Sequence, residues 1–233
     1  MLIFVDIELS SFESDGVICS IGLIGIKDGK ITKHYELINE GKKITPEASA
    51  LHHITNEMIE GAPAFKASLS YKFISQNSAT VVLHNAKGEL SKLMSSGLRL
   101  KHLIDTCRVS KHLMQECEMF YLQYLRYELK LYKDELEEAQ KCGIEDALVA
   151  HHALSDAVIV KLLYDYLLEL AAAERMEELS FKEVLLEKFS FGKYKGRYIE
   201  EIAMSDRAYL MWMLSLEDLD EDVRYSLEYY LEG

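Results

Sequence analysis

The sequence has little of what separates or links folded units. Only two of its 233 residues are proline and twelve are glycine, which argues against a low-complexity or linker-rich protein. With 49% hydrophobic residues, the chain is long enough for one large core and a second, smaller unit. No hydrophobic run approaches the roughly 18 to 20 residues of a membrane span, so we expect no association with a membrane.

Paired cysteines are also missing. None of the four cysteines lies in a CxxC pair, and their spacing is not that of a zinc site. No basic stretch precedes the first hydrophobic residues, as it would in a secretory signal. We therefore expect reduced thiols and a cytoplasmic location. The cysteines are Cys19, Cys107, Cys117 and Cys142.

Positive charge is in short supply, because 26 basic residues stand against 39 acidic ones and the net charge is −13. Such a protein repels a polyanion as a whole, so a nucleic-acid substrate needs a local basic patch or bound cations. One basic segment exists between residues 188 and 198, where four cations occur without an acidic residue. They are Lys188, Lys193, Lys195 and Arg197.

Two interpretations of this basic segment stay open. In the first, its cations bind a phosphate backbone and its aromatic residues stack on bases, which makes Lys193, Lys195 and Arg197 substrate-binding residues. In the second, it is a glycine-turned hairpin whose aromatic residues pack on Trp212 and whose cations pair with acidic neighbours. Those neighbours are Glu200 and Glu201.

Two carboxylates lie two residues apart in the first predicted strand, which covers residues 2–8. Residues at this spacing point to the same face of a strand, so Asp6 and Glu8 converge. Carboxylates that close need a cation, a proton or a basic partner, and a hard divalent metal ion takes oxygen ligands. The alternative is that Glu8 lies in water beyond the end of the strand.

The order of the remaining elements predicts an α/β fold with a mixed sheet. Strands at 17–26 and 31–38, joined by an Asp-Gly turn, complete an antiparallel three-stranded meander. Short buried strands at 80–83 and 103–106 then alternate with helices, which indicates parallel strands and helices on both faces. An amphipathic stripe from Leu122 to Ala139 predicts a further helix that packs on the sheet. A long apolar helix is expected at 154–170.

The composition changes near residue 175. The segment after it is punctuated by glycine, carries the basic patch and continues into two or three short helices. We therefore expect one domain at residues 1–175 and a small C-terminal domain at residues 176–233.

Three later residues extend the carboxylate pair. Glu89 follows a buried strand at the start of a helix, Asp156 lies early in the long helix, and His151 lies in the loop before it. Loops of this kind meet at one edge of an open α/β sheet, where clefts form. The carboxylates would hold two Mg²⁺ or Mn²⁺ ions about 3.5–4 Å apart for a phosphoryl displacement, and His151 would deprotonate the attacking water. Solvated acidic residues and a structural histidine remain the alternative.

Several short motifs follow one another along nearly the whole chain. They are Asp6-x-Glu8, His52-His53-Ile54-Thr55, His84-Asn85-Ala86-x-x-Glu89, His151-x4-Asp156, Phe191-Gly192-Lys193-Tyr194-Lys195-Gly196-Arg197 and Tyr209-Leu210-x-Trp212. The first four resemble, in this order, the DEDDh (DnaQ-like) 3′–5′ exonucleases, which have a ribonuclease-H-like fold. The last two are similar to the small C-terminal module of the exodeoxyribonuclease X group.

This resemblance implies hydrolysis of DNA from a 3′ end with release of nucleoside 5′-monophosphates, with DNA as the binding partner. It implies that His151 is the general base and that His52 and Asn85 contact the substrate. It also implies a catalytic set of metal ligands for two Mg²⁺ or Mn²⁺ ions. These ligands are Asp6, Glu8, Glu89 and Asp156.

The chain departs from the family pattern in three places, one of which is Leu9-Ser10-Ser11 after the first glutamate, where the family has small polar residues and glycine. The family has aspartate where this chain has Glu89, and an aromatic residue where it has Gly88. A misplacement near 1 Å at such a site costs about 100-fold in rate. A catalytically weak nucleic-acid-binding or scaffold protein therefore remains an alternative, as does an RNA-trimming exonuclease. His152 adjoins the proposed base, and the four-residue spacing to Asp156 selects His151.

Overall fold

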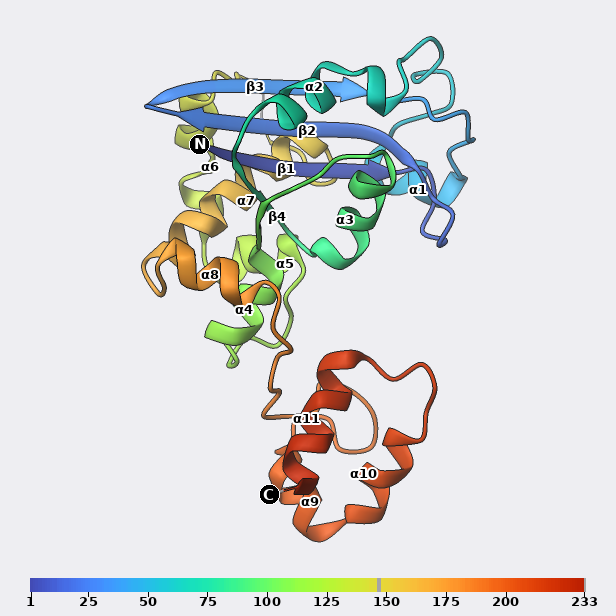
Figure 1. Ribbon diagram of the computed structural model, residues 1–233, viewed down its shortest axis with the longest axis vertical. Coiled ribbons are helices and arrows are strands. Elements are labelled where there is room, and N and C mark those ends of the chain that lie inside the picture. Colours follow the sequence, from blue (N-terminus) through green and yellow to red (C-terminus); the bar gives the residue numbers. More distant parts are fainter. Residues whose placement is uncertain (146–147, 233) are drawn as a thin grey trace.

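The computed structural model describes residues 1–145 and 148–232, and of residues 86–90 it describes the backbone alone. A five-stranded sheet forms its centre, in the order β3-β2-β1-β4-β5 (Figure 1). The strands are β1 (Leu2–Leu9), β2 (Ile18–Lys27), β3 (Lys30–Leu37), β4 (Thr80–Leu83) and β5 (His102–Asp105).

Helices cover both faces of the sheet and form the C-terminal part of the chain. The first half contains α1 (Pro46–His52), the 3-10 turn η1 (Phe65–Ala67), α2 (Leu69–Gln76), α3 (Ala86–Ser95) and α4 (Thr106–Leu113). The second half contains α5 (Leu122–Glu128), η2 (Leu131–Lys133), α6 (Glu135–Lys141), α7 (Ala153–Leu168), α8 (Ala173–Leu179), α9 (Ile199–Ser205), α10 (Arg207–Leu214) and α11 (Glu221–Glu232).

The sheet topology confirms the predicted mixed α/β sheet. Strands β1, β2 and β3 form an antiparallel meander, and β4 and β5 extend it in parallel on the other side of β1. The turn between β2 and β3 has positive φ at Asp28 (51°) and Gly29 (75°), a conformation that an Asp-Gly pair readily adopts. The central position of β1 makes its carboxyl end a natural place for a cleft.

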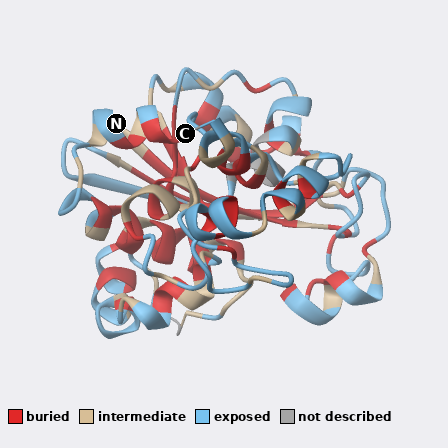
Figure 2. Ribbon diagram, turned by 90° about the horizontal axis from the view of Figure 1, so that it is seen from below, coloured by how far each residue is buried: buried red, intermediate tan, exposed pale blue. Residues whose placement is uncertain are grey.

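The two faces of the sheet carry separate hydrophobic cores, because side chains alternate along each strand. On one face Phe4 of β1 packs with α7, where its ring meets Tyr164 edge-on at 5.4 Å. On the other face Ile3 and Val5 pack with a cluster that includes Phe65. Figure 2 shows the buried strands enclosed by helices whose outer surfaces are exposed. Asp6 and Glu8 continue the Phe4 face.

The single helix predicted from the stripe between Leu122 and Ala139 is wrong. The structure has α5, η2 and α6 there, and Lys130 adopts a left-handed conformation (φ 59°) before η2. Arg126 of α5 pairs with Glu135 of α6 at 2.7 Å across this break. Residues nine apart in one continuous helix would lie about 13 Å apart along its axis, so this ion pair requires the broken path.

The C-terminal part of the chain has a small core of its own, at the lower end of Figure 1. Phe189, Ile199, Leu210 and Leu227 are buried in it. The predicted division at residues 175 and 176 stays a prediction. Helix α8 runs across this division, and its Met176 and Leu179 pack against the α7 core. Among the described residues, no helix combines the length and the apolar character that crossing a membrane requires.

Candidate functional site

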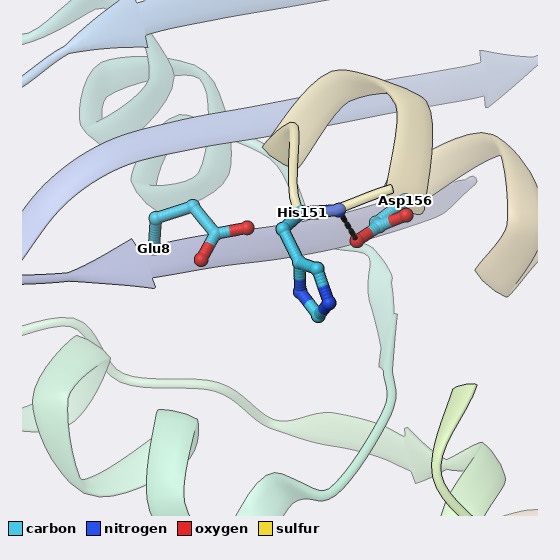
Figure 3. A group of neighbouring side chains, drawn as sticks. All are labelled: Glu8, His151 and Asp156. Atoms are coloured by element: carbon cyan, nitrogen blue, oxygen red, sulfur yellow. Dashed lines mark hydrogen bonds between the residues drawn. The ribbon is translucent and has the colours of Figure 1, made fainter. Parts of the chain in front are cut away.

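Three titratable side chains meet near the carboxyl end of β1 (Figure 3). One ligand atom from each of Glu8, His151 and Asp156 lies within 4.8 Å of the other two. Glu8 comes from β1, Asp156 from the first turn of α7, and His151 from the loop before that helix. The predicted placement of His151 before the helix and Asp156 inside it is therefore what the structure has.

Asp6 lies two residues before Glu8 on the same face of β1. Both side chains are buried, with 7% and 8% of their surfaces exposed, and both line one cleft. Asp6 is not a member of the three-residue group found among the described side chains. The alternative that Glu8 lies in water beyond the strand is wrong, because β1 extends to Leu9 and pairs Glu8 with Ser20 of β2.

Gly22 of β2 lets α7 approach these carboxylates. It pairs with Asp6 across the two strands, and a Cβ at this position would collide with the backbone of Ala153 and Leu154 at the start of α7. Only glycine permits such an approach of two backbones. Sequence reasoning missed Gly22, although a glycine inside a predicted strand signals close backbone contact.

Hydrogen bonds from two sides hold the Asp156 carboxylate. The backbone N–H of His151 donates to Oδ2 at 2.9 Å, and Gln123 Nε2 donates to Oδ1 at 2.7 Å. Arg126 Nη1 in turn donates to Gln123 Oε1 at 3.1 Å, while its other nitrogens bind Glu135. Sequence reasoning missed Gln123 and Arg126, because no local pattern says that α5 faces Asp156.

His151 adopts a backbone conformation with φ 61°, which residues other than glycine rarely adopt and which is frequent at functional sites. This conformation directs the backbone N–H of His151 to Asp156 and leaves the imidazole ring beside Glu8 (Figure 3). Burial lowers the pKa of His151, so its imidazole is neutral at neutral pH and can accept a proton.

His152 has a different environment. It precedes α7 as its N-cap, with Nδ1 3.4 Å from the backbone nitrogen of Ser155. Its ring stacks on Tyr35 of β3 with the ring centroids 4.3 Å apart. His152 thus supports the start of α7, and the structure brings His151, not His152, to the carboxylates.

The buried carboxylates of Glu8 and Asp156 have too little positive charge near them to offset their own negative charges. Desolvation raises the pKa of Glu8, and the charge of Asp156 raises it further. Desolvation also raises the pKa of Asp156, although the hydrogen bonds from His151 and Gln123 and the charge of Arg126 oppose this. Two buried carboxylates that repel each other require a proton or a cation. Their oxygens and an imidazole nitrogen suit a divalent ion, so the residues fit a metal site.

The cleft around this group has a volume of about 1340 Å³. Of the other residues predicted for the site, His52, Asn85 and Lys195 also line it. Glu89 belongs to α3, which begins directly after Asn85. Its side chain lies outside the described residues.

His52 is buried, and both of its ring nitrogens have partners within the chain. Nδ1 accepts the backbone N–H of Ile54 at 3.1 Å, so Nε2 carries the proton and donates to the carbonyl of Leu9 at 3.2 Å. Burial lowers its pKa. Asn85 is exposed, with φ 61°, and its backbone N–H donates to Asp105 Oδ1 at 2.9 Å.

Two family models match the chain. The exonuclease model matches residues 3–164, and the exodeoxyribonuclease X-like C-terminal model matches residues 189–217. Exodeoxyribonuclease 10 of Escherichia coli (strain K12) is 26% identical over 241 residues that span 100% of both chains. The 3′-5′ exonuclease DinG of Bacillus subtilis (strain 168) is 27% identical over 176 residues, which are 72% of this chain and 17% of that protein.

Two solved structures share the fold. Exonuclease X in complex with 5′ overhanging duplex DNA matches with a TM-score of 0.60 and 23% identity, over 77% of this chain and 99% of that one. A 3′-exonuclease that recognises the histone mRNA stem-loop matches with a TM-score of 0.52 and 12% identity, over 76% and 83% of the chains. These similarities confirm the predicted ribonuclease-H-like architecture.

Proposed function

The chain belongs to the exonuclease family, and on this basis we propose that it hydrolyses DNA from a 3′ end and releases nucleoside 5′-monophosphates. The observation that carries the proposal is the convergence of Glu8, His151 and Asp156 in one cleft. The similarity along the full chain to an exodeoxyribonuclease supports DNA as the substrate.

Two divalent ions, Mg²⁺ or Mn²⁺, are the cofactors in this proposal. The buried oxygens of Glu8 and Asp156 support it, because a bound cation offsets their repulsion. When bound, such ions neutralise phosphate charge and stabilise the attacking and leaving oxygens. The role of Glu89 rests on the family resemblance. The proposed ligands are Asp6, Glu8, Glu89 and Asp156.

His151 is the general base in this proposal. Its neutral imidazole takes a proton from the water that attacks the phosphorus atom of the terminal nucleotide. The bond from phosphorus to the O3′ of the preceding nucleotide breaks, and that oxygen takes up a proton from solvent. The backbone N–H of His151 holds Asp156, so the base and one carboxylate keep a fixed relation during the reaction.

His52 and Asn85 are the proposed contacts to the terminal nucleotide, since both line the cleft. Because both ring nitrogens of His52 bind the chain, we assign His52 a packing contact with the sugar. Asn85 has an exposed side chain that can donate to the phosphate or accept from the sugar.

A 5′-labelled single-stranded DNA, incubated with the protein and Mg²⁺ or Mn²⁺, tests the proposal. We expect a ladder of shortened labelled strands together with nucleoside 5′-monophosphates, and neither product from the Asp156→Asn variant. Intact DNA that remains bound would instead indicate a scaffold protein on this fold. Digestion of RNA but not of DNA would indicate an RNA-trimming enzyme.

A further inference from the structure

We propose that the C-terminal unit, taken as residues 176–233, is a second wall of the cleft that holds the single strand leading to the 3′ end. The binding residues on this wall are Lys188, Phe191 and Lys195. This inference rests on the proposed function, because it assumes that the 3′ end lies at Glu8, His151 and Asp156.

The cleft itself joins the two parts of the chain. The same continuous space is lined by Asp6 and Glu8 at one end and by residues 186–191 and Lys195 at the other. Residues 115–123 line it in between, because Gln123 binds Asp156 at one end and Gln115 Nε2 donates to the carbonyl of Leu185 at the other. If the 3′-terminal nucleotide lies at β1, the nucleotides that precede it extend along the cleft toward the C-terminal unit.

A buried ion cluster fixes the C-terminal unit to the nuclease domain. Asp222 of α11 is only 3% exposed, and its Oδ1 accepts a hydrogen bond from Arg108 Nη2 of α4 at 2.9 Å. Lys111 Nζ lies 3.5 Å from the other carboxylate oxygen. Arg108 Nε also donates to the carbonyl of Lys182 at 2.6 Å. A buried carboxylate with this many charged and hydrogen-bonding partners defines one geometry for the two parts.

The basic segment is a hairpin shaped by Gly192 (φ 72°) and Gly196 (φ 82°), and one bridge joins Lys188 to Tyr198. Part of it matches the structural interpretation from the sequence, although Asp206 is not one of the predicted ion-pair partners, and Trp212 contacts the ring of Tyr209. Lys193 pairs with Asp206 at 3.1 Å, and Arg197 pairs with Glu201 at 3.0 Å. The aromatic rings of Phe189, Tyr194 and Tyr209 pack against one another.

The remaining hairpin residues face the cleft instead. Lys188, Phe191 and Lys195 line it, and Phe191 is 45% exposed. Lys195 forms no ion pair with any residue that the structure describes. Lysine cations bind phosphates and an exposed aromatic ring stacks on a base in proteins that hold single strands. The ion-paired residues of the segment thus follow the structural interpretation, and we infer the binding interpretation for the residues that line the cleft.

Residues 115–123, in the middle of the cleft, offer no lysine or arginine to the strand, although the exposed ring of Tyr121 can stack on a base. Glu116 and Glu118 line it there and repel a phosphate backbone. The cleft-lining lysines outside the ion cluster of Asp222 lie on the far wall, so phosphate binding is concentrated there. A substrate that ends before the hairpin gains nothing from it, and affinity rises once the strand is long enough to reach Lys188 and Lys195.

Fluorescence anisotropy with labelled oligothymidylates of increasing length tests this, in EDTA so that the strand stays intact. We expect Lys188→Ala/Lys195→Ala to bind long strands about tenfold more weakly than wild type, with a salt slope about 1.4 units shallower for two lost phosphate contacts. Lys72→Ala is the matched control, because it removes one cation from α2 on the opposite face of the sheet. Equal affinity and equal salt slope in wild type and the double variant would overturn the inference.

Asp222→Asn tests the ion cluster, and it should weaken binding of long strands more than of dinucleotides. Arg108→Gln removes the same contact from the nuclease side, which keeps the test valid if Asp222→Asn unfolds the small core. Unchanged length dependence in both folded variants contradicts the proposed wall.

A small ester separates this inference from the proposed function. The p-nitrophenyl ester of thymidine 5′-monophosphate cannot reach the hairpin, so the ratio of kcat/KM for long DNA to that for the ester should fall in Lys188→Ala/Lys195→Ala. A wild-type protein that cleaves neither the ester nor DNA contradicts the proposed function. One that cleaves both, with an unchanged ratio in the variant, contradicts the inference alone.

Discussion

The two ends of the cleft differ in how the fold treats charge. At β1 and α7, Glu8 and Asp156 are buried and their pKa values are raised by desolvation, whereas at the hairpin Phe191 is exposed and the lysines reach solvent. Burying a charge costs folding free energy, and leaving one in water costs little. The carboxylate end therefore lowers the free energy of unfolding in return for a fixed geometry, whereas charges at the hairpin end cost little folding free energy.

The positions of the side chains at the carboxylate end are also more narrowly constrained by their neighbours. Gly22 admits the start of α7, and Gln123 and Arg126 orient Asp156. Among the described residues, none forms a hydrogen bond or an ion pair with the Lys195 side chain. Substitutions at the carboxylate end should therefore change rate far more than affinity, and those at the hairpin should do the reverse.

The largest effect is expected from Asp156→Asn. Loss of a charged ligand worth about 5 kcal/mol of transition-state stabilisation corresponds to a rate reduction of about ten-thousandfold. The metal-free variant should nevertheless lose only a few degrees of melting temperature, because it removes the cost of burying a carboxylate but also one of the two hydrogen bonds that Asp156 accepts. Single-turnover rates and thermal unfolding in EDTA measure the two quantities. A variant that loses stability in parallel with activity contradicts the comparison.

His151→Gln should lower the single-turnover rate by about a hundredfold to a thousandfold, within the range of general bases. His152→Gln is the matched control next to it. Since His152 caps α7 and stacks on Tyr35, its loss should lower stability by about 1 kcal/mol and change the rate much less. A larger rate effect at His152 would reverse the assignment of the base.

Gly22→Ala should reduce the rate by about a hundredfold, because the start of α7 must move away from β1 and carry Asp156 with it. Gly25→Ala in the same strand is the control. Its new Cβ would lie 2.7 Å from the Phe73 ring, away from the cleft, and that ring can move. The rates of the two variants are compared at equal folded fraction. Equal rates would contradict the role of Gly22 in positioning α7 and Asp156.

One further prediction leaves the rate aside and concerns stability and pH. Burial and Asp156 raise the pKa of Glu8 from 4.5 to about 8, so the folded metal-free protein holds a proton that the unfolded chain releases. This contribution to stability is complete below pH 4.5 and is lost as pH rises through 8. The shift corresponds to about 5 kcal/mol, so between these limits wild type should lose about 10 °C or more in melting temperature relative to Glu8→Gln. Thermal unfolding in EDTA measures the melting temperature of both proteins as a function of pH. Parallel pH profiles of wild type and Glu8→Gln would contradict the buried-charge interpretation.

Local rules explain which parts of the site the sequence predicts. The period-two geometry of a strand places Asp6 and Glu8 on one face, and the spacing of His151 and Asp156 places one before a helix and the other in its first turn. The meander follows from the Asp-Gly turn. Each of these depends only on residues close in the chain.

The unpredicted parts depend on contacts between distant segments. Gln123 meets Asp156, and Arg108 meets Asp222, across 33 and 114 residues of sequence. The break between α5 and α6 is set by the Arg126 ion pair and by packing on the sheet. No periodicity encodes such approaches, so the second wall of the cleft emerges only from the tertiary structure.

Calorimetric titration with Mn²⁺ tests the metal site most directly. Wild type should bind Mn²⁺ at neutral pH, and Glu8→Gln/Asp156→Asn should lose most of this binding while remaining folded. Release of protons on binding is expected in wild type, because burial has raised the pKa of both carboxyls. Equal Mn²⁺ affinity in wild type and the double variant would contradict the assignment of Glu8 and Asp156 as metal ligands.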